Sequence, residues 1–337
     1  MLLKIKQMKE ITMFGNFLKN LTDRKPLIHS ITNYVTANDC ANILLACGAS
    51  PIMADDVNEA AEITGICDGL NISLGTLSSR VIPSMLAASA RANSLGHPVV
   101  LDAVGIGASH FRLDTASQLI SQIKFSIIKG NISEIKSLAI GLGFSEEIDS
   151  NASNAIQSAK HQKTSLLSIN KDDVNSDSSG KDSTIQSGKH KEIPLPSSGV
   201  DAAEGDAVTR EQLDDTVRFI KHSAKKAQTI IAATGAIDII SDGNSAFCIY
   251  NGNPMMSRVT GTGCQLSAMT AAYAAANPDD MLAAAAAAAA TMGVCGEIAF
   301  ERLSAQDGSA TYRNYIIDAV YRLTPAELER RSKYEIR

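Results

Sequence analysis

The sequence predicts an α/β protein with a central, mainly parallel β-sheet flanked by α-helices. Two observations lead to this fold class. Hydrophobic residues make up 45% of the 337 residues, whereas aromatic residues make up only 4% and tryptophan is absent, so the core must be aliphatic. Helical and strand-like segments also alternate along the chain, as βαβ units with parallel strands require. Continuous runs of Val, Ile, Leu and Ala are typical of elements buried on both faces.

The first folded zone covers about residues 12–142. Two helical patterns each stop at a glycine, which is a common helix C-terminus. Strand-like segments lie between and beside them, and several end in polar residues. The expected helices are Ala37–Cys47, closed by Gly48, and Val81–Leu95, closed by Gly96; the expected strands are Gly69–Leu74, Pro98–Leu101 and Phe125–Lys129, with His29–Asn33 and Ser50–Met53 ending two more.

The middle zone, about residues 145–206, has a different composition. It is rich in Ser, Asn, Asp, Lys and Gly, and its stretch Asn170–Lys191 shows no apolar periodicity. Such a stretch cannot bury enough surface to offset the entropy lost on ordering. We therefore expect residues 145–198 to be a flexible surface insertion within one domain that spans residues 12–337.

The third zone begins near Arg210 and is again typical of a folded chain. We expect a helix over Glu211–Lys226, followed by a strand over Thr229–Thr234. Two further strands, Asp238–Ser241 and Ala246–Tyr250, flank the turn Asp242–Asn244. An alanine-rich run, Ala283–Ala290, is too short to span a membrane, so we expect a buried helix that extends to about Phe300.

Charge and cysteine usage exclude several classes of protein. The net charge of −5 gives no general attraction to nucleic acid or to anionic membranes. The six cysteines form no CxxC pair and no zinc-type spacing, so we expect free, mostly buried thiols in a reducing compartment. Met1–Ile11 lacks the apolar stretch and cleavage site of a signal peptide, and we expect a cytoplasmic protein.

The segment Gly261–Cys264, with the sequence GTGC, is the first candidate for chemistry. It follows an extended segment and precedes an apolar helix. Glycines at a helix N-terminus let backbone N–H groups approach a phosphate, and the helix dipole favours negative charge there. The alternative is a tight turn without a ligand. The third glycine of a dinucleotide-binding fingerprint is missing, and the sequence contains no P-loop.

Cys264 lies in the first turn of the helix that this segment begins. A helix N-terminus lowers the pKa of a thiol and favours the thiolate. Cys264 is therefore a candidate reactive group, and the alternative is a small buried hydrophobic residue.

Carboxylates at two strand ends suggest a magnesium site. Asp102 ends one expected strand, at the sheet edge where open α/β sheets bind ligands. Asn131 and Glu134 follow another strand, three residues apart on one face of a helix start. Magnesium usually keeps several waters and takes few carboxylates, so this set could hold a hydrated ion. The alternatives are a turn aspartate and a helix cap.

The order of these motifs is more specific than any one of them. PLIHSITNYVTAND, GASPIMA, NISLGTLS, VVLDAVGIGAS, IKGNISEI, AATGAIDIISDG and NPMMSRVTGTGCQLSA follow one another along the chain. Over residues 25–142 and 199–325 this series resembles the hydroxyethylthiazole kinase family. The resemblance implies a ribokinase-like fold and a homotrimer with its sites at subunit interfaces. It also implies magnesium-dependent transfer of the ATP γ-phosphoryl group to 4-methyl-5-(2-hydroxyethyl)thiazole in thiamine salvage.

The resemblance also assigns roles to residues of this chain. Cys264 stands where related kinases usually have an aspartate as catalytic base, and Gly261 matches a glycine beside the substrate hydroxyl. The implied sites are as follows: catalytic, Gly261, Thr262, Gly263 and Cys264; substrate-binding, Asn33, Met53 and Gly261; ATP-binding, Lys129, Asn131 and Thr234; magnesium, Asp102 and Glu134.

The chain departs from the family pattern at three places. Lys129 stands where the family commonly has arginine, which keeps the charge but loses the bidentate geometry. Ala103 replaces a proline after Asp102, and the insertion is not a family feature. Rival functions are a hydroxymethylpyrimidine or pyridoxal kinase, an NAD(P)H-hydrate dehydratase and a silent thiamine-precursor binding protein. The first two would be expected to carry aspartate in place of Cys264.

Overall fold

The computed structural model describes residues 14–144 and 212–337, and the strands of these segments form one sheet. The sheet has nine strands in the order β2-β1-β3-β4-β5-β6-β7-β8-β9. The first six in this order run parallel, and the last three are added antiparallel. The strands are β1 (Leu27–Ile31), β2 (Ser50–Ile52), β3 (Gly69–Ser73), β4 (Val99–Asp102), β5 (Ile127–Asn131), β6 (Ile230–Thr234), β7 (Asp238–Ser241), β8 (Ala246–Ile249) and β9 (Tyr334–Ile336).

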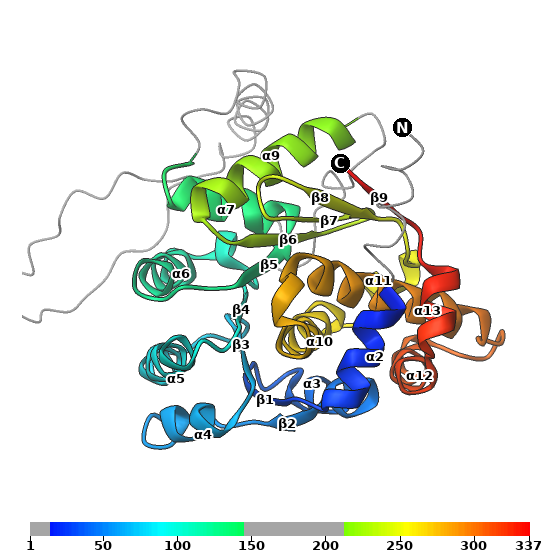
Figure 1. The fold of residues 1–337 in the computed structure, drawn as a ribbon, viewed down its shortest axis with the longest axis horizontal. Helices are drawn as coiled ribbons and strands as arrows, with labels where there is room; N and C mark the ends of the chain where they lie inside the picture. The colour runs from blue at the N-terminus through cyan, green and yellow to red at the C-terminus, as the bar shows by residue number, and fades with distance from the viewer. Residues whose placement is uncertain (1–13, 145–211) are drawn as a thin grey trace, which may run out of the picture.

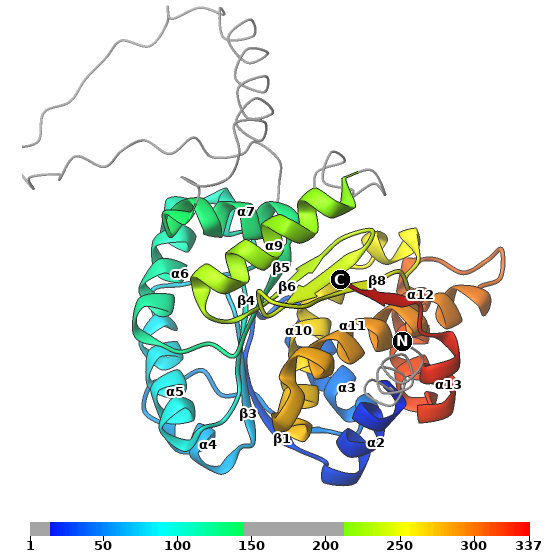
Figure 2. The same ribbon diagram turned by 45° about the horizontal axis from the view of Figure 1, so that its top comes forward.

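Helices cover both faces of this sheet (Figures 1 and 2) and bury an aliphatic core on each. One face carries α2 (Phe14–Arg24), α3 (Ala37–Cys47), α10 (Thr262–Ala276), α11 (Met281–Glu301), α12 (Ser309–Arg322) and α13 (Pro325–Arg331). The other carries α4 (Ala60–Ile66), α5 (Ile82–Leu95), α6 (His110–Gln122), α7 (Ile132–Gly141) and α9 (Leu213–Ala227). The predicted fold class, α/β with a mainly parallel sheet, is confirmed.

The predicted helix ends and turns are confirmed where glycine chemistry carried the prediction. Gly48 follows α3 with φ 95° and Gly96 follows α5 with φ 71°, so both glycines end their helices in the left-handed conformation. Gly243 has φ 95° in the turn between β7 and β8. L-residues rarely adopt this conformation, which explains why glycine marks these positions.

One predicted strand is shifted by two residues in the structure, and one strand was not predicted. The strand predicted over Phe125–Lys129 is shifted and runs over Ile127–Asn131, because β6 pairs with β5 as far as Asn131 opposite Thr234. Strand β9 was not predicted from the sequence. It is three residues long and pairs antiparallel with β8.

The alanine-rich helix α11 shows why burial, rather than length, decides its interpretation. The apolar segment Pro278–Glu301 has 24 residues and is long enough to cross a membrane. The shortness of the run Ala283–Ala290 is therefore not enough to exclude a membrane span. However, 78% of its most apolar window is buried inside the protein, and α11 packs between α10 and α12. The helix is therefore the predicted buried core helix.

The predicted insertion at residues 145–198 lies outside the described residues.

Candidate active site

The site lies at the carboxyl edge of the parallel strands, where the sheet register places polar residues side by side. Ser73 at the end of β3 is opposite Asp102 at the end of β4. Asp102 is in turn opposite Lys129 in β5. The amino end of α10 packs against this edge and contacts both β3 and β4. Residues far apart in the sequence are thus brought together by strand pairing alone.

Lys129 and Asp102 form a buried ion pair at the centre of this edge. Lys129 Nζ lies 3.0 Å from Asp102 Oδ1, and their side chains are 5% and 0% exposed. Burial disfavours the ammonium ion, but the charges of Asp102 and Glu134 outweigh this effect and raise the pKa of Lys129. Lys129 therefore stays charged, and its attraction to a polyphosphate would be little screened by water.

The GTGC turn, residues Gly261–Cys264, closes over this pair. Gly261 precedes α10 with φ 85°, and its backbone carbonyl accepts the N–H of Gln265 in the first helical turn. The N–H groups of Thr262 to Cys264 have no acceptor within the helix, as at any helix start. A Cβ atom on Gly263 would lie 2.8 Å from Lys129 Nζ, so this glycine leaves the space that the ammonium group occupies.

Cys264 is held between two strand ends. Asn33 Nδ2 donates to Cys264 Sγ at 3.3 Å, and Ser73 Oγ lies 4.0 Å from the same sulfur. Asn33 is itself fixed, because its Oδ1 accepts the N–H of Thr36 at 3.0 Å. The structure therefore joins Asn33, predicted to bind substrate, to the predicted catalytic cysteine.

The predicted lowering of the Cys264 pKa is wrong. Burial, reinforced by the negative charge of Asp102, raises the pKa of this thiol to about 12, although Lys129 acts in the opposite direction. The helix N-terminus does not compensate for removing a thiolate from water. Cys264 is accordingly a protonated thiol at neutral pH. All six cysteines are free and buried, which was predicted for the five other than Cys264.

Glu134 and Asn131 form a reciprocal helix cap at the start of α7. Asn131 Oδ1 accepts the N–H of Glu134 at 2.8 Å, and Glu134 Oε2 accepts the N–H of Asn131 at 2.7 Å. Glu134 Oε1 accepts the N–H of Gly105 at 2.6 Å. Burial raises the pKa of Glu134. The capping alternative is thus present in the structure, and Glu134 also fixes the loop that follows Asp102.

The carboxylates suit a hydrated magnesium ion better than a cation held by protein alone. No group of three or more His, Cys, Asp or Glu side chains is arranged around a common point in the described residues. Each oxygen of Asp102 and Glu134 accepts one hydrogen bond and keeps a second acceptor position. Magnesium bound through waters and phosphates needs no more than one or two such carboxylates.

Two predicted residues lie further from this cluster. Thr234 ends β6, and its hydroxyl donates to the carbonyl of Gly130 at 3.4 Å. Met53 follows β2 and is 39% exposed. Because β2 pairs with β1 and β6 pairs with β5, both lie at the same edge of the sheet. Their substrate and nucleotide contacts stay predictions.

Ser267 was missed by the sequence analysis. It lies one turn after Cys264 and its side chain reaches Asp102. The available signal was a polar residue at this spacing within an alanine-rich helix, although serines in such helices often bond only to their own backbone.

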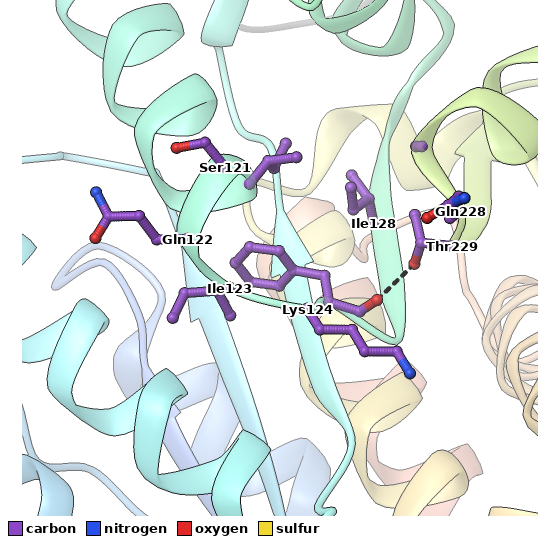
Figure 3. A pocket seen from close by; sticks show the side chains of 10 residues that line it. Ser121, Gln122, Ile123, Lys124, Ile128, Gln228 and Thr229 are labelled. Carbon is purple, nitrogen blue, oxygen red and sulfur yellow. Dashed lines mark hydrogen bonds between the residues drawn. The ribbon is translucent and has the colours of Figure 1, made fainter.

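A separate depression of about 330 Å³ lies near the amino end of β5 (Figure 3) and contains none of the predicted site residues. Lys124 is the only charged residue among those that line it, and Thr229 closes one side through a 2.7 Å hydrogen bond to the carbonyl of Phe125. The depression thus offers no chemistry comparable to that of the carboxyl edge.

A glycine turn at a helix N-terminus beside a buried cation, at the carboxyl edge of a mainly parallel sheet, has the features of an α/β protein that binds a phosphorylated ligand. The Hydroxyethylthiazole kinase family model matches residues 18–190 and 180–326. The chain belongs to this family.

Individual relatives agree with that assignment over nearly the whole chain. A hydroxyethylthiazole kinase from Clostridium acetobutylicum is 47% identical over 96% of this chain and 99% of its own length. One from Methanobrevibacter smithii is 35% identical over 97% and 98%. The solved structure of a hydroxyethylthiazole kinase protein from Pyrococcus horikoshii OT3 superposes with a TM-score of 0.70 at 29% identity, covering 96% and 98% of the two chains.

Proposed function

We propose that this chain transfers the γ-phosphoryl group of ATP to the hydroxyl of hydroxyethylthiazole. The observation that carries the proposal is the contact of the GTGC turn with the buried Lys129–Asp102 pair. Backbone donors and a desolvated cation converge there, as phosphoryl transfer requires. The thiazole as acceptor is supported by the names of the family and of relatives that match at full length.

The reaction needs positioning more than proton transfer. The substrate oxygen forms a bond to the γ-phosphorus while the bond to the ADP oxygen breaks, through a loose transition state. The amides of the GTGC turn would stabilise the transferring group, and Lys129 would bind the polyphosphate. Asp102 and Glu134 would hold a magnesium ion, which would supply further charge neutralisation. Since Cys264 is a protonated thiol and cannot accept it, the hydroxyl proton is lost late, to an oxygen of the transferred phosphoryl group.

The proposal is tested by ADP release from the purified protein with magnesium and ATP. Hydroxyethylthiazole and hydroxymethylpyrimidine are compared as acceptors. Turnover with the thiazole alone is the expected result. Turnover with the pyrimidine alone would support a kinase but would show that its acceptor is not the thiazole. Binding of the thiazole without turnover of either acceptor would favour a binding protein.

Substitutions of Cys264 test whether it acts as a hydrogen-bonding thiol and not as a base. Cys264→Ala is expected to slow turnover by roughly a hundredfold or less, because a protonated thiol does not supply the about 10²–10⁴-fold of general-base catalysis. Cys264→Asp should retain or raise the activity, since an ionised carboxylate accepts the proton more readily than a thiol. Steady-state ADP release measures both variants.

Cys295→Ala is the matched control, because it removes a fully buried thiol from the core helix α11. The raised pKa of Cys264 adds a second test. Because the raised pKa keeps the Cys264 thiol protonated, the wild-type rate and the Cys264→Ala rate should depend on pH in the same way between pH 8 and 9. A step in the wild-type rate that is missing from Cys264→Ala would contradict the role of Cys264 as a protonated, hydrogen-bonding thiol. Complete inactivity of both Cys264 variants would contradict it as well.

We further propose a cytoplasmic homotrimer of this kinase domain with sites at subunit interfaces. Apolar side chains are exposed in the loops after β1 and β2, beside the site, namely Tyr34 (82% exposed), Val35, Met53 and Val57. A second copy would remove this surface from water. Light scattering of the purified protein should give the mass of three chains, and a monomer that is fully active would refute the shared sites.

A further inference from the structure

Ser267 is a buried polar residue that the proposed reaction does not yet use. It lies in the alanine-rich helix α10 and is 0% exposed. Its neighbours toward the sheet are the elements that carry the site, because α10 packs against β3 and β4. A hydroxyl at this position costs free energy unless it forms hydrogen bonds.

The Ser267 hydroxyl has two acceptors within reach. Its Oγ lies 3.2 Å from Asp102 Oδ2 and 2.9 Å from the carbonyl oxygen of Cys264. One hydroxyl carries one proton, and a carboxylate in a buried site is the stronger acceptor. Lys129 binds the other oxygen of the same carboxylate at 3.0 Å.

These contacts fix Asp102 from both sides. Lys129, which is in the neighbouring strand, sets one carboxylate oxygen, and Ser267 in the first turns of α10 sets the other. A carboxyl group can rotate about its bond to Cβ, and two donors on different elements prevent this rotation. The second bond also ties Asp102 to the helix whose N-terminus forms the GTGC turn.

We propose that Ser267 is a positioning residue that holds the Asp102 carboxylate in register with the GTGC turn during phosphoryl transfer. The inference rests on the proposed kinase function and adds a residue to it. Because Ser267 is 0% exposed, we expect it to contact neither the acceptor nor the nucleotide, so its effect should fall on the chemical step and not on binding of the thiazole.

The experiment compares Ser267→Ala, Ser267→Cys and Thr270→Val by steady-state kinetics and thermal unfolding. Cysteine keeps a heavy atom at the γ position, although sulfur is larger than oxygen, and it is only a weak donor, so it leaves no cavity while it weakens the hydrogen bond. Thr270 is the matched control, because its buried hydroxyl, one turn further along α10, donates only to the Leu266 carbonyl.

Both Ser267 variants should lower kcat by about 10- to 100-fold, as expected for losing a hydrogen bond to a charged group, with the KM for the thiazole within about twofold of wild type. Thr270→Val should match the wild-type rate. The cysteine variant leaves no cavity, so it provides the test if the alanine variant fails to fold.

Wild-type kcat in the cysteine variant would overturn the proposal, and so would a slow Thr270→Val of equal stability. A rise in KM for the thiazole with kcat unchanged would also overturn it, because that result assigns Ser267 to substrate binding. Wild-type protein in the same assay distinguishes the kinase function from the role of Ser267. If the wild type shows no turnover, the kinase function itself is refuted.

Discussion

Replacing Lys129 with methionine is expected to abolish turnover and to destabilise the protein by about 3–5 kcal/mol, the usual cost of breaking a buried ion pair. The variant leaves Asp102, which is 0% exposed, with Ser267 as its remaining side-chain donor. It also removes the cation beside the GTGC turn. Urea unfolding and ADP release measure the two losses independently.

A double-variant cycle separates these two effects. Asp102→Asn alone should also destabilise the protein, because Lys129 then lacks its main counter-charge. The combined Lys129→Met and Asp102→Asn variant buries no unpaired charge, so it should recover much of the stability but none of the activity. A double variant as unstable as the sum of the singles would show that the two charges do not interact.

A surface pair provides the control for this cycle. Arg218 and Asp215 form an ion pair in which both side chains are 76% exposed. Arg218→Met should cost less than about 1 kcal/mol and leave turnover unchanged, since solvent screens exposed pairs. If this variant were as damaging as Lys129→Met, the loss at Lys129 could not be attributed to burial.

Strand ends were the part of the fold and site that the sequence predicted best. Asp102 and Lys129 each stood at the end of an apolar run, and parallel pairing brings such ends to one edge without further information. The glycine after a helical pattern was equally informative at Gly48 and Gly96, because few other residues tolerate a positive φ.

Properties set by packing could not be predicted in the same way. The direction of the Cys264 pKa depends on how deeply α10 buries the thiol and on the nearby Asp102, neither of which is local in sequence. The contact of Ser267 with Asp102 joins residues 165 positions apart. Strand β9 exists because β8 offers it an edge, although it is only three residues long and too short to be predicted from its own sequence.

Gly261→Ala is expected to abolish turnover, because it disturbs the GTGC turn in two ways. Gly261 has φ 85°, where an L-residue costs roughly 1–2 kcal/mol. Its new Cβ would lie 2.4 Å from Thr36 Cγ2, a distance at which one of the two segments must move. Thr36 is buried and its N–H is held by Asn33, so the glycine turn would be the segment displaced. ADP release and urea unfolding measure the result.

Two further variants distinguish the backbone conformation from the steric contact. Gly96→Ala introduces a side chain at φ 71° with no atom within 4 Å, so it should cost about 1 kcal/mol and leave turnover unchanged. Adding Thr36→Ser to Gly261→Ala removes the Cγ2 atom and should restore part of the activity. If the combined variant stayed as inactive as Gly261→Ala while Gly96→Ala behaved as expected, the positive φ of Gly261, and not the contact with Thr36, would determine the position of the amides that bind the phosphoryl group.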